Sequence, residues 1–484
     1  MVTTTRSEEK APRRGLGRRG RAWVCAALAL ALAAPAGAAD VDGRIERIEE
    51  QLRALQAELD ELRAEKRAEE KREAEQARKT DVLADTVESL KEQLTVPAEK
   101  PLEGRHGLAP AASKVYGVER GLSIGGYGEA LFAKPVKDKG GASAIADFQR
   151  FVLYTGYKFS DRILVNAEIE FEHGTTDDTI SASDGAVSLE FAYLDFFLRE
   201  WANARAGLLL VPVGLINERH EPTTFFGVNR PEVARRLIPT TWRELGAGLF
   251  GRIGESLEYR MYGIVGMNAR GFDASGIRGG RQSGNRSRAE DFAFVGRLDY
   301  EPGPALRLGT SVYTGEGGQG QTVDGVRIPS SQLTLWEGHG EWRSWGLRLR
   351  GLLAASFLED ARQLTGALRR TGDIGLDETI AGQMIGGYVE AAYDVLPWLW
   401  PETEQALAPF VRFSYLNTQW QTPRGDVGIG EPLGPDGRFQ VRIWTVGLDY
   451  KPMPQVVLKL DYRDFNPVAG SRPSSVNLGI GFVF

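Results

Sequence analysis

Residues 162–173 read RILVNAEIEFEH, and apolar side chains occupy the odd-numbered positions: Ile163, Val165, Ala167, Ile169 and Phe171. Most of the other positions are polar or charged, namely Arg162, Asn166, Glu168, Glu170 and Glu172. Successive side chains of a β-strand point to opposite faces of a sheet. This period of two therefore predicts a strand with one apolar face and one charged face.

The same alternation recurs along the chain after about residue 120, and it is especially clear in the last ten residues, which end on Phe484. Reading every such segment predicts strands at residues 122–133, 147–159, 162–173, 187–199, 204–213, 245–252, 256–267, 290–301, 305–314, 332–343, 346–357, 384–395, 408–418, 439–451, 455–465 and 475–484. The predicted strands number sixteen, which is an even number.

The connections between these strands alternate in length. Short turns, such as residues 344–345 and 452–454, alternate with long loops such as 214–244, 268–289 and 419–438. The connection at residues 396–407 is an exception, because it is long although the alternation predicts a short turn at this place. Alternating segments of about ten residues, joined in this way, are typical of a membrane-spanning barrel. A soluble β-sandwich would also alternate, but its loops would not sort so regularly by length.

We therefore predict an all-β transmembrane barrel of about 16 antiparallel strands over residues 120–484, preceded by an N-terminal α-helical coiled coil. The terminal Phe484 is the expected assembly signal of the barrel. Glycine accounts for 58 of the 484 residues, and apart from one segment near the N-terminus no apolar run is long enough for a membrane helix. The formal net charge of -6 argues against a nucleic-acid-binding protein.

Residues 1–39 have the three parts of a secretory signal peptide. A basic region with Arg13, Arg14, Arg18, Arg19 and Arg21 precedes an apolar core at residues 22–34, and the small residues Ala36, Gly37, Ala38 and Ala39 follow it. The single cysteine, Cys25, lies in that core, so the exported chain is expected to contain no thiol. Residues 1–39 carry seven basic and two acidic side chains, and residues 40–100 carry 12 basic and 18 acidic ones. The total charge of -6 therefore leaves a net charge of -5 for residues 101–484.

Residues 40–96 show the spacing of a coiled coil. Apolar residues recur at intervals of three and four at Ile45, Ile48, Leu52, Leu55, Leu59 and Leu62, and again at Leu83, Val87, Leu90 and Leu94. The same heptad frame runs through the charged centre between the two groups, which favours self-association over a solvated single helix without fixing the oligomer number. Pro97 and Pro101 end the helix, and residues 97–119 have the composition of a linker.

Sixteen strands leave a lumen wide enough for water, so the segment that narrows it controls permeation. The best candidate is the third long loop, residues 214–244, with the constriction residues Arg219, His220, Glu221, Arg230, Arg235, Arg236 and Arg243. The wall is expected to present Glu168, Glu170, Glu172, Lys459 and Arg463 to the lumen. The loop arginines either form a local basic ring or pair with neighbouring glutamates and brace the loop against the wall.

The sequence gives no sign of catalytic or metal chemistry. The histidines His106, His173, His220 and His339 show no ligand spacing, and no nucleophile motif is present. We expect no enzyme activity, no cofactor and no metal. A second basic loop, with Arg270, Arg278, Arg281, Arg286 and Arg288, is suited to contact the phosphates of lipopolysaccharide.

Five segments together resemble the phosphate-selective porin O/P family of outer-membrane proteins. They are residues 125–129 (GGYGE), 168–173 (EIEFEH), 217–222 (NERHEP), 225–231 (FFGVNRP) and 238–242 (IPTTW). The similarity covers roughly residues 115–484. It implies a sixteen-stranded, trimeric porin whose third long loop folds into the pore.

The expected function is passive diffusion of small hydrophilic solutes or anions, phosphate among them, across a bacterial outer membrane, with the coiled coil in the periplasm. The expected partners are outer-membrane lipids, lipopolysaccharide and two further copies of the chain, with no nucleic acid. The main alternative is a structural tether whose coiled coil links the outer membrane to the cell wall. A barrel-embedded hydrolase is a third class.

Overall fold

The structure is a computed structural model that describes residues 41–94, 103–136, 141–176 and 185–484. The expected signal peptide at residues 1–39 lies outside the described residues. The chain divides into two compact units, Met1–Glu92 and Gln93–Phe484. The first contains one long helix and the second is a barrel, and each is described by itself.

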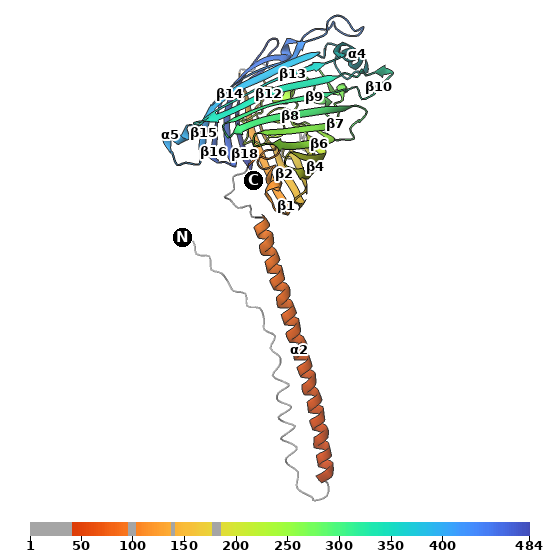
Figure 1. Cartoon of the computed structure of the whole chain (residues 1–484), viewed down its shortest axis with the longest axis vertical. Helices are drawn as coiled ribbons and strands as arrows, with labels where there is room; N and C mark the ends of the chain where they lie inside the picture. Colours follow the sequence, from red (N-terminus) through yellow and green to blue (C-terminus); the bar gives the residue numbers. More distant parts are fainter. Residues whose placement is uncertain (1–40, 95–102, 137–140, 177–184) are drawn as a thin grey trace. The chain divides into compact units, whose positions relative to one another are not determined.

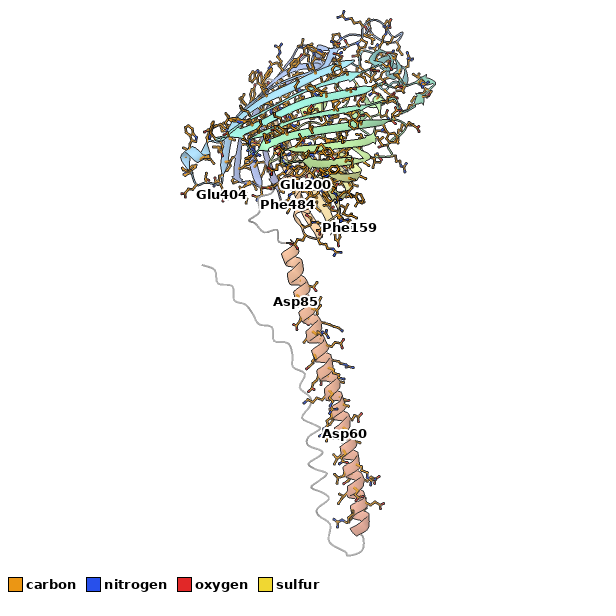
Figure 2. All side chains as sticks on the ribbon, in the orientation of Figure 1. Asp60, Asp85, Phe159, Glu200, Glu404 and Phe484 are labelled. Carbon is orange, nitrogen blue, oxygen red and sulfur yellow. The ribbon has the colours of Figure 1, made fainter. Side chains whose placement is uncertain are left out.

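The helix α2 (Val41–Leu94) is 54 residues long, which confirms the helix expected from the heptad pattern. One stripe of the helix is apolar and open to solvent, with side chains that are 47–57% exposed: Ile45, Ile48, Leu52, Leu55, Leu59 and Leu62. Asp60 and Asp85, labelled in Figure 2, mark charged positions along the same helix. No helix of the described residues is long and apolar enough to cross a membrane. Self-association of α2 stays a prediction.

The second unit is a closed antiparallel barrel (Figure 1). Its strands are β1 (Gly121–Val136), β2 (Ile145–Ser160), β3 (Ile163–Glu172), β4 (Ala186–Arg199), β5 (Ala202–Leu210), β6 (Arg243–Ile253), β7 (Leu257–Val265), β8 (Phe292–Gly303), β9 (Leu306–Gly315), β12 (Leu333–Ser344), β13 (Leu347–Leu358), β14 (Gln383–Tyr393), β15 (Ala406–Gln421), β16 (Gln440–Met453), β17 (Val456–Pro467) and β18 (Ser474–Val483). Each overlaps one predicted strand, so the sixteen-stranded fold is confirmed.

The two faces of the barrel wall differ in chemistry. On the outer face, apolar side chains are 41–45% exposed, among them Leu249, Met261, Leu298, Leu308 and Leu458. On the inner face, charged side chains are buried, among them Glu168, Arg260, Arg297, Arg412 and Asp461. The period of two along each strand therefore separates an apolar exterior from a charged interior.

The two rims of the barrel also differ. Phe159, Glu200, Glu404 and Phe484 all lie at the rim of short turns, spread along it (Figure 2). The opposite rim carries the long loops, including α4 (Ala361–Thr371) and the small hairpin of β10 (Thr322–Val323) and β11 (Val326–Arg327) (Figure 1). The long connection on the short-turn rim contains α5 (Leu396–Leu399).

The barrel closes where β1 pairs with β18. The amide of Phe484 donates to the carbonyl oxygen of Gly126 at 2.9 Å, and the amide of Gly126 donates to the carbonyl oxygen of Phe484 at 3.0 Å. A Cβ atom at Gly126 would lie 2.6 Å from the Phe484 ring, and one at Gly128 would lie 2.4 Å from the Phe482 ring. Glycine at these two positions therefore leaves room for the rings of Phe484 and Phe482 where β1 pairs with β18. The role of Phe484 in assembly stays a prediction.

Candidate functional site

The long connection between β5 and β6, residues 211–242, folds into the lumen of the barrel. Its apolar residues Val213, Leu237 and Trp242 are completely buried, and they pack with side chains of the wall in one apolar cluster. The short helix α3 (Glu232–Arg236) lies within this lumen loop. The loop is fixed to the wall at several separate points.

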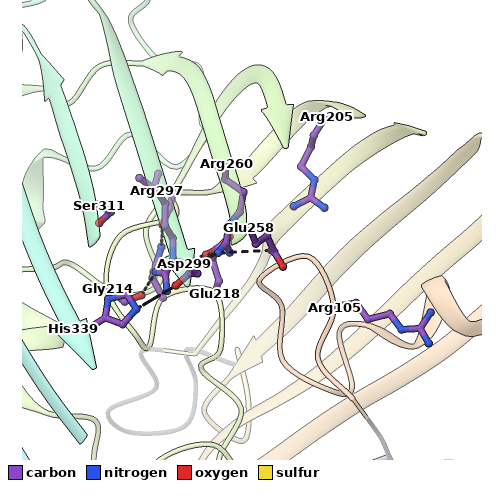
Figure 3. A network of polar contacts seen from close by, with 12 residues as sticks. Arg105, Arg205, Gly214, Glu218, Glu258, Arg260, Arg297, Asp299, Ser311 and His339 are labelled. Carbon is purple, nitrogen blue, oxygen red and sulfur yellow. Dashed lines mark hydrogen bonds and ion pairs between the residues drawn. The ribbon is translucent and has the colours of Figure 1, made fainter. Parts of the chain in front are cut away.

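The first point of attachment joins the beginning of the lumen loop to β7, β8 and β12. Arg260 on β7 binds the Glu218 carboxylate at 2.5 Å and also pairs with Asp299 on β8. Arg297 donates to Asp299 at 2.7 Å and to the carbonyl oxygen of Gly214. Figure 3 shows this network, which ends on His339 of β12, whose Nε2 lies 3.3 Å from Asp299.

We call the second point of attachment the histidine anchor, formed by His220, Glu168 of β3 and Glu190 of β4. Nδ1 of His220 lies 2.8 Å from the carbonyl oxygen of Asn217. Nε2 lies 3.1 Å from a carboxylate oxygen of each glutamate. All three side chains are at most 2% exposed. Burial by itself would lower the pKa of His220, but the two carboxylates raise it to about 10.

Residues 103–117, within the stretch interpreted as a linker, also lie inside the barrel; we call them the lumen segment. Leu108, Ala111 and Ala112 are buried. The amides of Ala111 and Ala112 donate to the Glu221 carboxylate at 3.2 and 2.9 Å. Burial raises the pKa of Glu221 to about 7.

Aromatic contacts hold the other end of the lumen segment. The His106 ring lies 4.7 Å from the Tyr116 ring and 5.2 Å from the Phe250 ring, centre to centre. The Tyr116 hydroxyl donates to Asp195 at 2.8 Å. Burial, reinforced by the charge of Arg205, lowers the pKa of His106 to about 4. The imidazole therefore packs in its neutral form.

The tip of the lumen loop reaches β16 and β17. Lys459 donates to the carbonyl oxygens of Phe225 and Gly227 at 2.8 and 2.9 Å. The amide of Val228 donates to Asp461 at 2.6 Å. Gly227 has a φ of 77°, and a Cβ there would lie 3.0 Å from the Asp461 carboxylate, so the turn favours glycine. The tip is thus fixed by backbone groups.

We call the last point of attachment the arginine anchor. Glu232 is buried and lies within 3.4 Å of four guanidinium groups, at 3.3, 3.1, 3.0 and 3.4 Å from Arg235, Arg236, Arg463 and Arg472, respectively. Burial opposes ionisation of this carboxyl, but Arg463 and the other three arginines hold the pKa of Glu232 well below its usual range. One negative charge therefore faces four positive charges.

Part of the second basic loop covers the end of the lumen loop. Arg278 and Arg281 donate to backbone carbonyl oxygens, including that of Thr240. Burial, together with neighbouring Arg281 and Arg235, lowers the pKa of Arg278 to about 9. Arg270 pairs with Asp373 at 2.7 Å. Three of the five arginines expected to contact lipopolysaccharide are therefore engaged within the barrel unit.

Among the described residues of the barrel, three cavities have more arginine than carboxylate in their lining, and the first and third of them are mainly polar. The first, about 140 Å³, has four arginines and three glutamates: Arg150, Arg230, Arg235, Arg278, Glu129, Glu172 and Glu232. The second, about 200 Å³, has three arginines and no acidic residue: Arg236, Arg438 and Arg472. The third, about 60 Å³, has five arginines and three acidic residues: Arg219, Arg252, Arg260, Arg297, Arg307, Glu258, Asp299 and Glu301.

The structure distributes the candidate residues from the sequence over different places. His220, Glu168 and Arg243 meet at the histidine anchor, where Arg243 binds Glu190 at 3.2 Å. Arg235, Arg236 and Arg463 meet at the arginine anchor, Lys459 holds the loop tip, and Glu221 holds the lumen segment. Arg219, Arg230 and Glu172 line cavities. Glu170 pairs with Arg150 at 3.3 Å.

Sequence reasoning missed Glu190, Arg472 and the lumen segment. Glu190 is on the buried face of β4, and a reading of lumen-facing positions strand by strand would have found it. Arg472 lies in the connection between β17 and β18, where no pattern in the chain marks it. The lumen segment has a composition rich in Gly, Ala and Pro, which does not distinguish a linker from a packed insert.

No family model matches the chain. An uncharacterized protein of Aquifex aeolicus (strain VF5) is 37% identical over 361 residues, which covers 74% of this chain and 78% of the relative. Among solved structures, OmpF of Salmonella typhi in complex with daunomycin is 11% identical with a TM-score of 0.48, and covers 76% of this chain and 98% of OmpF. The anion-selective porin from Comamonas acidovorans is 12% identical with a TM-score of 0.47, and covers 76% of this chain and 100% of the porin.

Proposed function

The chain belongs to the same family as the Aquifex aeolicus protein, and from the barrel itself we propose a non-enzymatic outer-membrane channel for passive diffusion of small hydrophilic solutes, preferentially anions. The observation that carries this proposal is the closed sixteen-stranded barrel with an apolar exterior and a charged interior. In lipid, every backbone polar group needs a partner within the protein, and closing the sheet supplies one. A barrel of this strand number has room for water and for an inserted loop.

The exterior supports placement in a membrane. The exposed apolar side chains lie on strands all around the wall, from Leu249 on β6 to Leu458 on β17. A soluble monomer rarely exposes apolar surface on this scale, whereas a bilayer covers it. Short turns on one rim and long loops on the other are typical of outer-membrane barrels, with the short turns on the periplasmic side.

The distribution of arginines supports a preference for anions. At the arginine anchor, four guanidinium groups share one carboxylate, and the three cavities described above have an excess of arginine. Fixed positive charge along a narrow path attracts anions and repels cations. The resemblance to the phosphate-selective porin O/P family makes phosphate the first anion to test. Guanidinium groups bind phosphate through paired, charge-assisted hydrogen bonds.

The reversal potential of the channel under a salt gradient tests this proposal. In planar bilayers with a KCl gradient, the reversal potential of the current through the unmodified channel should have the same sign as the equilibrium potential of chloride. Arg235→Glu, which changes a half-exposed side chain, should move the reversal potential toward zero by roughly half, because the charge of the arginine anchor falls.

The control is Arg327→Glu, which makes the same charge change on the exposed hairpin of β10 and β11. It should leave the reversal potential unchanged. A reversal potential of the cation sign in the unmodified channel, or equal shifts from the two variants, would reject anion selection at the arginine anchor.

A structural tether is the second candidate, and the exposed apolar stripe of α2 favours it. Six Ile and Leu residues at heptad spacing on a 54-residue helix require a partner, which another copy of α2 or a cell-wall component supplies. We propose that α2 self-associates in the periplasm, and the family resemblance points to a trimer. A barrel that conducts no ions would make the tether the main function.

A further inference from the structure

The histidine anchor directs one ring nitrogen of His220 toward two buried carboxylates. A carbonyl oxygen only accepts hydrogen bonds, so Nδ1 of His220, at 2.8 Å from the carbonyl oxygen of Asn217, carries the ring proton. Nε2 then presents either a second proton or a lone pair toward the oxygens of Glu168 and Glu190. A lone pair facing two carboxylates requires a cation between them.

We propose that His220, Glu168 and Glu190 bind one divalent metal ion of the zinc class through Nε2 and one oxygen of each carboxylate. The ligand atoms of the three side chains lie within 4.8 Å of one another. The 3.1 Å separations of Nε2 from the two oxygens are close to the roughly 3.3 Å between ligands of a tetrahedral ion with bonds of about 2.0–2.1 Å. A fourth position is left for water.

Two further observations point to a ligand at this place. The second oxygen of Glu168 is buried without a hydrogen-bond partner among the described residues, and the Glu190 oxygen that faces Nε2 is completely buried at 3.1 Å from that nitrogen. The hydrogen bond from Nδ1 to a backbone carbonyl is the usual second contact of a metal-bound histidine, because it fixes the tautomer and the ring orientation.

The carbonyl that orients the ring is itself held in place. The side chain of Asn217 donates to the carbonyl oxygens of Val211 and Trp242 at 2.7 and 2.9 Å, and accepts from the amide of Trp242 at 2.8 Å. These bonds tie the two ends of the lumen loop together beside the proposed ion. A metal ion here would therefore link β3, β4 and the lumen loop at one atom.

A second buried histidine in the barrel shows the contrasting arrangement. Nδ1 of His339 lies 2.9 Å from Glu337, and Nε2 lies 3.3 Å from Asp299 (Figure 3). Each nitrogen thus has its own carboxylate, and Arg297 also lies 3.1 Å from Nε2. Two carboxylates on opposite sides of a ring cannot converge on one ion. His339 is therefore a matched control.

The test measures bound metal directly and does not depend on channel activity. The full chain, without a histidine tag, is stripped with a chelator and refolded with Zn²⁺, because the three ligand side chains are closed off from solvent. After removal of free ion, we expect one Zn²⁺ per chain. His220→Gln and Glu190→Gln should lose it, whereas His339→Gln should keep it.

Substitution with Co²⁺ supplies a second readout that needs no variant. Four-coordinate Co²⁺ bound to a nitrogen and two oxygens should give a visible absorption band in the unmodified chain, and Zn²⁺ should displace it. This readout decides the question if His220→Gln fails to fold. Absence of both bound Zn²⁺ and the cobalt band would overturn the proposal. His220 would then be a protonated imidazole that forms ion pairs with Glu168 and Glu190. Equal Zn²⁺ loss in His339→Gln would overturn it as well.

Discussion

The histidine anchor and the arginine anchor hold the same lumen loop with opposite charges. At residue 220 an imidazole lies between two carboxylates, and at residue 232 a carboxylate lies among four guanidinium groups. The wall supplies Glu168 and Glu190 at the first anchor, and Arg463 and Arg472 at the second. At the second anchor the loop itself supplies Glu232 together with Arg235 and Arg236. One anchor suits a cation and the other suits an anion.

The net charge of the barrel region gives no hint of this arrangement. Residues 101–484 carry a net charge of -5, yet the three cavities described above all have an excess of arginine. An ion in the lumen experiences the nearest fixed charges much more strongly than distant ones, which are screened within about 10 Å at ordinary salt. The selectivity of the channel therefore depends on local placement.

The largest effect is expected from removing the single carboxylate of the arginine anchor. Glu232→Gln leaves four guanidinium groups close together without a counter-charge, and Arg463 among them is buried. Breaking a buried ion pair from one side costs about 3 kcal/mol or more. Urea unfolding in detergent should show this loss relative to Glu359→Gln, which makes the same change at an exposed position.

The same type of change next to the histidine anchor should have much less effect. The Glu170 carboxyl lies beside Glu190, so two carboxyl groups crowd together there. Glu170→Gln relieves that crowding, and Arg150 keeps its 2.8 Å pair with Glu129. The free energy of unfolding should change by less than about 1 kcal/mol. Equal losses from Glu232→Gln and Glu170→Gln would show that the two anchors do not differ in charge balance.

Acid should release the lumen segment, with a smaller loss of stability, and leave the arginine anchor intact. The amides of the lumen segment bind Glu221, which is next to His220. In the same segment His106 is buried in its neutral form, because burial lowers the pKa of its imidazole to about 4. A released imidazole takes up a proton near pH 6.5, its ordinary pKa. The contribution of His106 to the free energy of unfolding is therefore fully present above pH 6.5, and it is lost as the pH falls toward 4.

Limited proteolysis between pH 7 and pH 4 measures this release. Cleavage after Arg105 by a protease active in acid should increase as the pH falls. His106→Phe removes the titrating group and keeps an aromatic ring beside Tyr116 and Phe250. This variant should be protected over the whole range. Identical pH profiles for the two proteins would exclude His106 as the cause.

The strands could be predicted from the sequence because their signal is local. In β3, for example, the alternation of apolar residues with Asn166, Glu168 and Glu170 follows directly from a wall with one apolar and one charged face. The sixteen predicted strands therefore match the barrel, with errors confined to their ends. The heptad spacing of α2 is equally local, and the helix was found for the same reason.

The anchors could not be predicted because their partners are far apart in the chain. Arg463 meets Glu232 across 231 residues, and Glu168 meets His220 across 52 residues. Register and loop folding decide these contacts, and no local pattern records them. The candidate metal group joins two strands and a loop, so a search for ligand spacing does not find it. The lumen segment is hidden by its composition, which is that of a linker.

The most direct test of the central claim is single-channel recording of the purified chain in planar lipid bilayers. The account predicts stable, repeated conductance steps in simple salt, with chloride carrying more current than potassium. Purified protein that inserts into bilayers without any steps would mean that the lumen is closed and that the barrel serves as an anchor. Protein that stays monodisperse in water without detergent would contradict the membrane-spanning barrel itself.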